Sequence, residues 1–179
     1  MPLPIAHGLL GATAALALRQ SSAHSCKPIL IGAFLGICPD FDYGLNWLHI
    51  GGGGWHHGFT HSILFAFILG MGGILISGER NLRSLLLFST AAVTHTLLDY
   101  LMTDSHGVAL WWPFTNQRYK LRLSNPIDYA WSQTSVLEAL VDIMRISLIE
   151  LLVFLPVLLL VMYIKKEWVK RTVTDAGDA

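Results

Sequence analysis

Histidine and aspartate, both of which bind divalent metal ions, recur in several short stretches of this 179-residue chain. In HTLLD, His95 and Asp99 are four residues apart, so a helix would place their side chains on one face, about 6 Å apart at Cβ. His57 and His61, in HHGFTHS, have the same separation, and His56 precedes them. Imidazole and carboxylate groups without thiolate favour Zn, with Mn or Fe(II) as alternatives, in a site with open positions for catalysis.

Two further stretches, HGLLGA with His7 and PDFD, add candidate ligands. In PDFD, Pro39 can end a helix and present Asp40 and Asp42 from a short turn, where residues two apart can point the same way. The aspartate that does not bind metal would serve as general base. Asp42 is preferred as the ligand and Asp40 as the base, but the sequence leaves this assignment open. The predicted metal ligands are His7, Asp42, His56, His61, His95 and Asp99, with His57 able to take the place of His56.

Each of these stretches also has a simpler interpretation. The His95 and Asp99 pair can be a hydrogen-bonded contact between membrane helices, and PDFD can be a helix stop with its carboxylates in water. The histidines near residue 60 can be solvated. The combination favours a metal site, because ionisable groups within a membrane are costly and usually functional.

The composition is that of a membrane protein. The chain is 53% hydrophobic and 13% charged, with a mean hydropathy of +0.52. Since a helix needs roughly 20 apolar residues to cross a bilayer, residues 59–78, 84–102 and 146–164 are clear spans, and 3–18 and 28–38 are shorter candidates. We therefore predict an all-α polytopic membrane bundle of about five membrane helices. Residues 1–165 would form one membrane-embedded domain and 166–179 a charged cytoplasmic tail.

The charges predict the orientation of the bundle and exclude one class of partner. With the N-terminus outside, eight Lys and Arg residues fall in inner segments and three in outer ones, as the positive-inside rule requires. All candidate ligands then lie at the outer face, although none was used to derive the orientation. The site would therefore face the periplasm or exterior, and the C-terminus the cytoplasm. A formal net charge of zero and the lack of a basic stretch with aromatics indicate no nucleic-acid partner.

Together, HGLLGA, PDFD, HHGFTHS, HTLLDY and GVALWWPF resemble the YdjM-like family of bacterial inner-membrane proteins over roughly residues 1–130. That family is described as membrane-bound metal-dependent hydrolases and sometimes as binding a transcriptional repressor. Its pattern reads His-Arg-Gly-x-Thr-His-Ser, so His56 and His61 match its histidines and His57 stands at its usual Arg position. His106 stands where the family tends to have a small or aromatic residue, which makes it an additional candidate ligand.

The order His, Asp, His, His-x-x-x-Asp is also similar to that of bacterial zinc-dependent phospholipase C and single-strand nuclease enzymes. This likeness implies phosphoester cleavage. An N-terminal Trp and the later His and Glu ligands of those enzymes have no counterpart here, so one or two ions are expected rather than three.

The leading hypothesis is a metal-dependent hydrolase that cleaves an ester or phosphoester of a lipid or lipid-linked substrate in the bilayer. Arg118 and Arg122, in the outer loop, would steer an anionic substrate. The alternative is a non-enzymatic protein that binds metal or translocates an ion or proton. For that alternative, Glu138, Asp142, Arg145 and Glu150 could line an inner path. The other interpretation is that Glu138 or Asp142 braces the site from a neighbouring helix, with Arg145 paired to Asp142. An outward-facing site gives no support to a role as a repressor partner.

Overall fold

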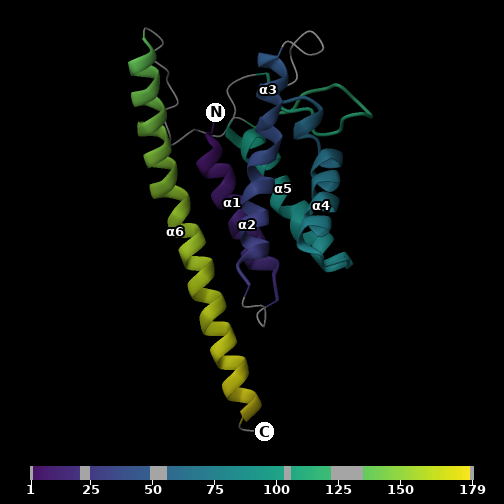
Figure 1. The fold of residues 1–179 in the computed structure, drawn as a ribbon, viewed down its shortest axis with the longest axis vertical. Coiled ribbons are helices and arrows are strands. Elements are labelled where there is room, and N and C mark those ends of the chain that lie inside the picture. Colours follow the sequence, from purple (N-terminus) through teal and green to yellow (C-terminus); the bar gives the residue numbers. More distant parts are fainter. Residues whose placement is uncertain (1, 21–24, 49–55, 103–105, 122–134, 178–179) are drawn as a thin grey trace.

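A computed structural model describes residues 2–20, 25–48, 56–102, 106–121 and 135–177 of the chain (Figure 1). Its long helices are α1 (Pro4–Leu18), α2 (Lys27–Ile37), α4 (Ile63–Ser77), α5 (Leu82–Met102) and α6 (Val136–Gly177). The described ranges contain no strand beyond one isolated bridge between Val108 and Tyr119. The all-α prediction is confirmed.

Successive long helices run in opposite directions, and this gathers distant parts of the sequence at one end of the bundle. Figure 1 shows α1 descending from the N-terminal end, α2 returning, α4 descending, α5 returning and α6 descending again. The start of α1, the end of α2, the start of α4 and the end of α5 therefore meet at the same end. The carboxyl end of α6 lies at the opposite end.

Within the described ranges, three helical segments are long and apolar enough to cross a membrane: Lys27–Leu45, Leu82–Met102 and Val136–Arg171. Pro4–Leu18 and Ile63–Ser77 are shorter apolar helices. The predicted segment 28–38 is thus part of a longer one, because the 3-10 helix η1 (Cys38–Phe41) and the short helix α3 (Asp42–Trp47) continue from α2. The predicted span 146–164 lies inside α6, which also continues to Gly177 through most of the predicted tail.

The predicted span 59–78 begins later than expected. Helix α4 starts at Ile63 because the Ser62 Oγ accepts a hydrogen bond from the Phe65 N–H at 3.1 Å and so caps the first turn. The residues before it form a turn and the 3-10 helix η3 (Phe59–His61). The histidines of HHGFTHS therefore lie on irregular backbone in front of the helix and not on its first turns.

Glycines bring α1 and α2 into direct backbone contact. A Cβ atom added at Gly11 would overlap the carbonyl oxygen of Gly32, and one added at Gly36 would overlap that of His7. Small residues of this kind let membrane helices approach closely. The close approach places His7 of α1 beside the last turn of α2, next to the PDFD stretch.

Helix α6 is attached to the start of α1 by a buried carboxylate. Glu150, which is fully buried, accepts hydrogen bonds from the backbone N–H groups of Leu3 at 2.5 Å and Ala6 at 3.1 Å. These N–H groups belong to the first turn of α1 and have no partner within the helix. Glu150 thus accepts hydrogen bonds from the N–H groups at the N-terminus of α1. The expected pairing of Arg145 with Asp142 is confirmed, with an N to O distance of 3.5 Å.

Candidate metal centre

Four of the His and Asp side chains converge at the end of the bundle where these helix ends meet. Asp40 comes from η1, His61 from η3, and His95 and Asp99 from α5. One ligand atom from each lies within 4.8 Å of the others, and three of the four side chains are completely buried. The structure therefore brings together three separate stretches of the sequence.

The distances within this group match those between the ligands of a small tetrahedral ion. The Nε2 atoms of His61 and His95 are 3.0 Å apart, and each lies 3.2 Å from Asp99 Oδ2. Asp40 Oδ1 lies 3.5 Å from His95 Nε2 and 3.7 Å from His61 Nε2. For Zn²⁺ with bonds of about 2.0 Å, the edge of a tetrahedron measures about 3.3 Å. The donor set and its spacing fit such an ion.

Hydrogen bonds at the other ring nitrogens decide which atoms face the centre. His95 Nδ1 lies 2.7 Å from the carbonyl oxygen of Gly36, which can only accept, so this nitrogen carries the proton. Thr60 Oγ1 donates to Asp42 Oδ2 at 2.6 Å and can therefore accept from His61 Nδ1 at 2.9 Å. In the neutral rings, both Nε2 atoms then present lone pairs to each other, an arrangement that needs a cation or a proton between them.

Several buried polar atoms around this group also indicate that it can hold a cation. Among the described residues, both ring nitrogens of His7, both carboxylate oxygens of Asp99 and Oδ1 of Asp40 have no hydrogen-bond partner. His7 Nε2 lies 3.6 Å from Asp99 Oδ1, and its ring stacks on that of His95 at a centroid distance of 3.8 Å. Buried polar groups without hydrogen bonds are costly, and a bound cation would remove that cost.

A turn places the adjacent residues His56 and His57 beside the four-residue group. His57 has a φ of 60°, in the left-handed region that is uncommon for residues other than glycine, and its Nε2 lies 3.7 Å from Asp99 Oδ2. Burial lowers the pKa of His57 to about 3, so the ring is neutral and suited to metal binding. One ligand atom each from His56, His57 and His61 also lies within 4.8 Å, which makes a second potential group.

Asp42 contacts two of the histidines and lies outside the four-residue group. Its Oδ1 is 3.0 Å from His56 Nδ1, and its Oδ2 accepts from Thr60 and lies 3.5 Å from His61 Nδ1. A carboxylate in this position fixes the orientation of imidazole rings. The sequence favoured Asp42 as ligand and Asp40 as base, whereas the structure places Asp40 closer to the central nitrogens and Asp42 behind the rings.

Carboxylates surround His61 and change its protonation. Burial by itself would lower the pKa of His61, but the close contacts with the carboxylates of Asp40 and Asp99 and the negative charge of Asp42 outweigh it and raise the pKa to about 9. Without a metal ion, His61 is therefore protonated at neutral pH, and a metal ion bound at its Nε2 would have to displace that proton.

The segment after α5 covers the turn that holds His56 and His57. The N–H of Ala109 donates to the carbonyl oxygen of His57 at 3.0 Å, and the N–H of Ile63 donates to Leu110 O at 3.1 Å. Arg118 Nη1 donates to the carbonyl oxygen of His56 at 3.3 Å. These bonds hold the turn, including the left-handed residue His57, against the start of α4.

Some expected residues lie elsewhere, and some functional neighbours were not expected. His106 is exposed and belongs to neither potential ligand group, and Arg122 lies outside the described residues. Thr60 and the Gly36 carbonyl, which contact His61 and His95, were not among the residues predicted from the sequence. The only signal for Thr60 was its place inside HHGFTHS, and none distinguished Gly36 from other helix glycines.

Comparison with known proteins places the chain in a family of membrane proteins. The sequence model of the YdjM inner membrane protein family matches residues 1–169. The inner membrane protein YbcI of Escherichia coli (strain K12) is 30% identical over 129 residues, which cover 66% of this chain and 72% of that protein. No solved structure matches the chain. With its apolar helices and a family model that spans nearly the whole sequence, the chain belongs to the YdjM inner membrane protein family.

Proposed function

We propose that this protein is a metal-dependent hydrolase that cleaves an ester or phosphoester of a membrane lipid or lipid-linked substrate. The observation that carries the proposal is the pair of facing Nε2 atoms of His61 and His95, 3.0 Å apart and both within 3.2 Å of Asp99. Because His95 Nδ1 is bound to the Gly36 carbonyl and His61 Nδ1 to Thr60, these two Nε2 atoms and the Asp99 carboxylate point at one place. Such an arrangement suits a positive charge, which is a proton when metal is absent and would be a divalent ion when metal is bound.

Asp40, His61, His95 and Asp99 would hold a first divalent ion, for which Zn²⁺ fits best. His7 and His57 each lie close to one oxygen of Asp99, at 3.6 and 3.7 Å, and would help to hold a second ion. The ion supplies Lewis acidity and lowers the pKa of water toward about 7.

The pair formed by Asp42 and His56 would provide the general base. Asp42 accepts from His56 Nδ1, which makes Nε2 the proton-accepting atom of the neutral ring. The His56 side chain is 15% exposed, more than its two histidine neighbours in the turn, so it lies toward the side from which a substrate arrives. In this assignment Asp42 positions His56 and His61 and does not itself take the proton.

A cavity next to Asp40 favours a lipid over a small soluble substrate. Its volume is about 410 Å³, and its lining is apolar apart from Asp40 and the Tyr43 hydroxyl: Pro2, Leu3, Pro4, Ile37, Asp40, Phe41 and Tyr43. An acyl chain in this cavity would place its headgroup beside the carboxylate of Asp40. Arg118, above the turn, would attract an anionic headgroup.

The orientation forms part of the proposal. The His and Asp cluster and the carboxyl end of α6 lie at opposite ends of the bundle (Figure 1). Lys165, Lys166, Lys170 and Arg171 near that carboxyl end favour the cytoplasm. A reporter fused to the C-terminus should therefore be active only in the cytoplasm, with the cluster facing the periplasm. A periplasmic signal would reverse this part of the proposal.

Metal analysis of the full chain in mild detergent tests the site. The parent should contain about one to two equivalents of metal, and His95→Ala and Asp99→Ala should lose most of it, since the three remaining ligands would bind the ion more weakly than four. His106→Ala is the matched control, because His106 is exposed and belongs to neither group. Equal metal content in all four proteins would reject the metal centre.

Release of phosphate, headgroup or fatty acid from a panel of defined membrane lipids tests the reaction. Product from one lipid class that disappears in His95→Ala would support the hydrolase. Bound metal without product from any class, together with metal-dependent ion or proton flux in proteoliposomes, would instead identify the non-enzymatic alternative.

A further inference from the structure

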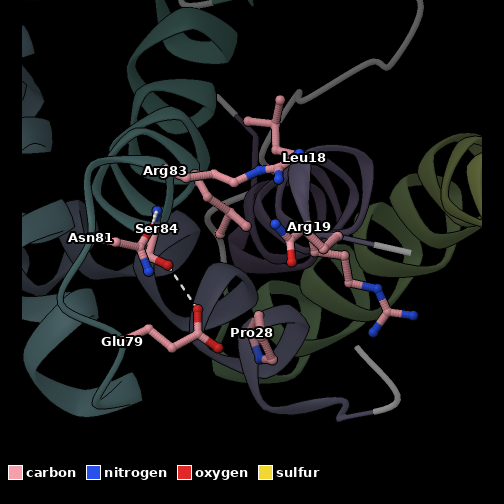
Figure 2. Close-up of a pocket in the computed structure, with 9 residues that line it drawn as sticks. Leu18, Arg19, Pro28, Glu79, Asn81, Arg83 and Ser84 are labelled. Carbon is pink, nitrogen blue, oxygen red and sulfur yellow. Dashed lines mark hydrogen bonds between the residues drawn. The ribbon is translucent and has the colours of Figure 1, made fainter. Parts of the chain in front are cut away.

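The end of the bundle opposite the metal centre gathers cations from three helices. Two adjoining cavities there, of about 350 and 710 Å³, share Arg19 after α1 and Arg83 in the first turn of α5. Figure 2 shows both arginines at the smaller cavity. The larger cavity is completed by Lys165 and Trp168 of α6. It thus lies between α1, α5 and α6.

The positive charges of this cavity are not balanced by the protein. None of Arg19, Arg83 and Lys165 forms an ion pair with a carboxylate among the described residues, and Arg83 makes no hydrogen bond there either. The Nε atom of Arg19 is buried without a hydrogen-bond partner in the same ranges. Lys165 Nζ donates to the carbonyl oxygen of Arg19 at 2.5 Å, which holds two of the cations together. Like charges held together attract an anion.

Among the described residues, one acidic side chain lines these cavities, and it lies at the smaller one. Glu79 accepts a hydrogen bond there from Ser84 Oγ at 2.7 Å, drawn as the dashed line in Figure 2. Neither Glu79 nor any other described carboxylate lines the larger cavity. The charged side chains that line the larger cavity are therefore all positive.

The wall of the larger cavity is apolar and lies along a membrane helix. Leu18, Ile164 and Trp168 line it and are 42%, 55% and 58% exposed. Residues Val136–Arg171 of α6 form a candidate membrane span, so this wall lies near the polar end of that span. Tryptophan is enriched at the depth of lipid headgroups. The cavity thus combines positively charged side chains with an apolar surface suited to a hydrocarbon chain.

We propose that this cavity binds an anionic phospholipid, with the headgroup phosphate between Arg19, Arg83 and Lys165 and an acyl chain against Leu18, Ile164 and Trp168. Guanidinium groups bind phosphate oxygens through paired, charge-assisted hydrogen bonds. Basic cavities between membrane helices are typical binding sites for anionic lipid headgroups. The proposal concerns the end of the bundle opposite the metal centre and does not depend on the hydrolase activity.

Native mass spectrometry of the full chain in mild detergent provides the test. Phosphatidylglycerol and phosphatidylcholine with identical acyl chains are added separately, and the lipid-bound fractions are compared. The parent should prefer phosphatidylglycerol. Arg83→Gln should weaken that preference about fivefold, the value of one cation near an anionic lipid. Arg83 forms no ion pair or hydrogen bond among the described residues. The Arg83→Gln variant should therefore unfold at the same temperature as the parent.

A second pair of variants separates the cavity from general surface charge. Arg19→Gln combined with Arg83→Gln and Lys165→Gln should abolish the preference. The matched control changes Lys166, Lys170 and Arg171 to Gln at the same end of α6 and should retain it, since none of these lines the cavity. Equal loss in both triple variants would overturn the proposal. Displacement of the lipid by an equal concentration of inorganic phosphate would also overturn it and identify a site for a soluble anion.

Discussion

The Nε2 atoms of His61 and His95 face each other at 3.0 Å, although 34 positions separate the two residues in the chain. Each ring is held from behind, His95 by the Gly36 carbonyl and His61 by Thr60 and Asp42. The rings cannot easily turn away from each other without breaking these buried hydrogen bonds. Whatever occupies the space between them, a proton or a metal ion, therefore controls the electrostatic balance of this end of the bundle.

Removal of the support behind the rings should weaken metal binding without removing a ligand. Asp42→Asn should lower metal affinity about 10- to 100-fold, the usual effect of losing a carboxylate that orients metal-binding histidines. Thr60→Val should act in the same direction, because it removes the link between His61 and Asp42. Competition with a coloured chelator measures both affinities. Thr60→Ser, which keeps the hydroxyl, should restore the parent value, and failure to do so would argue against this relay.

Metal affinity should rise with pH. The pKa of His61 is raised to about 9, above its ordinary value of 6.5, so the ion must displace a proton at neutral pH. Affinity should therefore increase up to about tenfold per pH unit between about pH 6.5 and 9 and then level off. The protonated contact stabilises the metal-free fold fully below pH 6.5, and this contribution is lost as pH rises through 9. Calorimetric titration in two buffers of different ionisation enthalpy should detect the released proton. Affinity independent of pH in this range would contradict the arrangement.

Gly36→Ala should destabilise the protein and disturb the metal centre together. The added Cβ would overlap the carbonyl oxygen of His7, and the backbone shift would displace the Gly36 carbonyl that binds His95. Overpacking of this kind typically costs about 1–3 kcal/mol. Gly72→Ala in α4 is the matched control, because its Cβ would meet nothing within 4 Å, and it should be neutral or slightly stabilising. Unfolding in detergent and metal content are measured for both. Equal stability of the two variants would show that α1 and α2 do not pack as described.

Glu150→Ala should loosen the contact between α6 and α1. Leu3 and Ala6 would lose the acceptor for two buried or partly buried N–H groups, at a cost of about 1.5–3 kcal/mol per hydrogen bond to a charged group. Glu138→Ala, on an exposed turn of the same helix, should change the free energy of unfolding by less than about 0.5 kcal/mol. Thermal unfolding compares the two. A Glu150→Ala protein as stable as Glu138→Ala would mean that this carboxylate has another role, such as lining an ion path.

The amino-acid sequence determined the features that depend on local composition and spacing. Apolar runs predicted membrane helices, and the separation of His95 from Asp99 placed both on one face of α5, where their ligand atoms are 3.2 Å apart. Consecutive helices that each cross the membrane must alternate in direction. The sequence therefore predicted that His7, PDFD, HHGFTHS and HTLLD lie at the same end of the bundle. These inferences succeed because a helix in a membrane must satisfy its own backbone and runs from one side to the other.

Only the tertiary structure decided which atoms face the centre. Helix α4 starts at Ile63, so His61 lies before the helix and not on it. Asp42 contacts the Nδ1 side of the His61 ring, whereas Asp40 lies beside the Nε2 atoms of His61 and His95. The contact between His95 and the Gly36 carbonyl joins residues 59 positions apart. No local periodicity encodes such a contact, because it depends on how closely two helices pack and on the rotation of each about its axis.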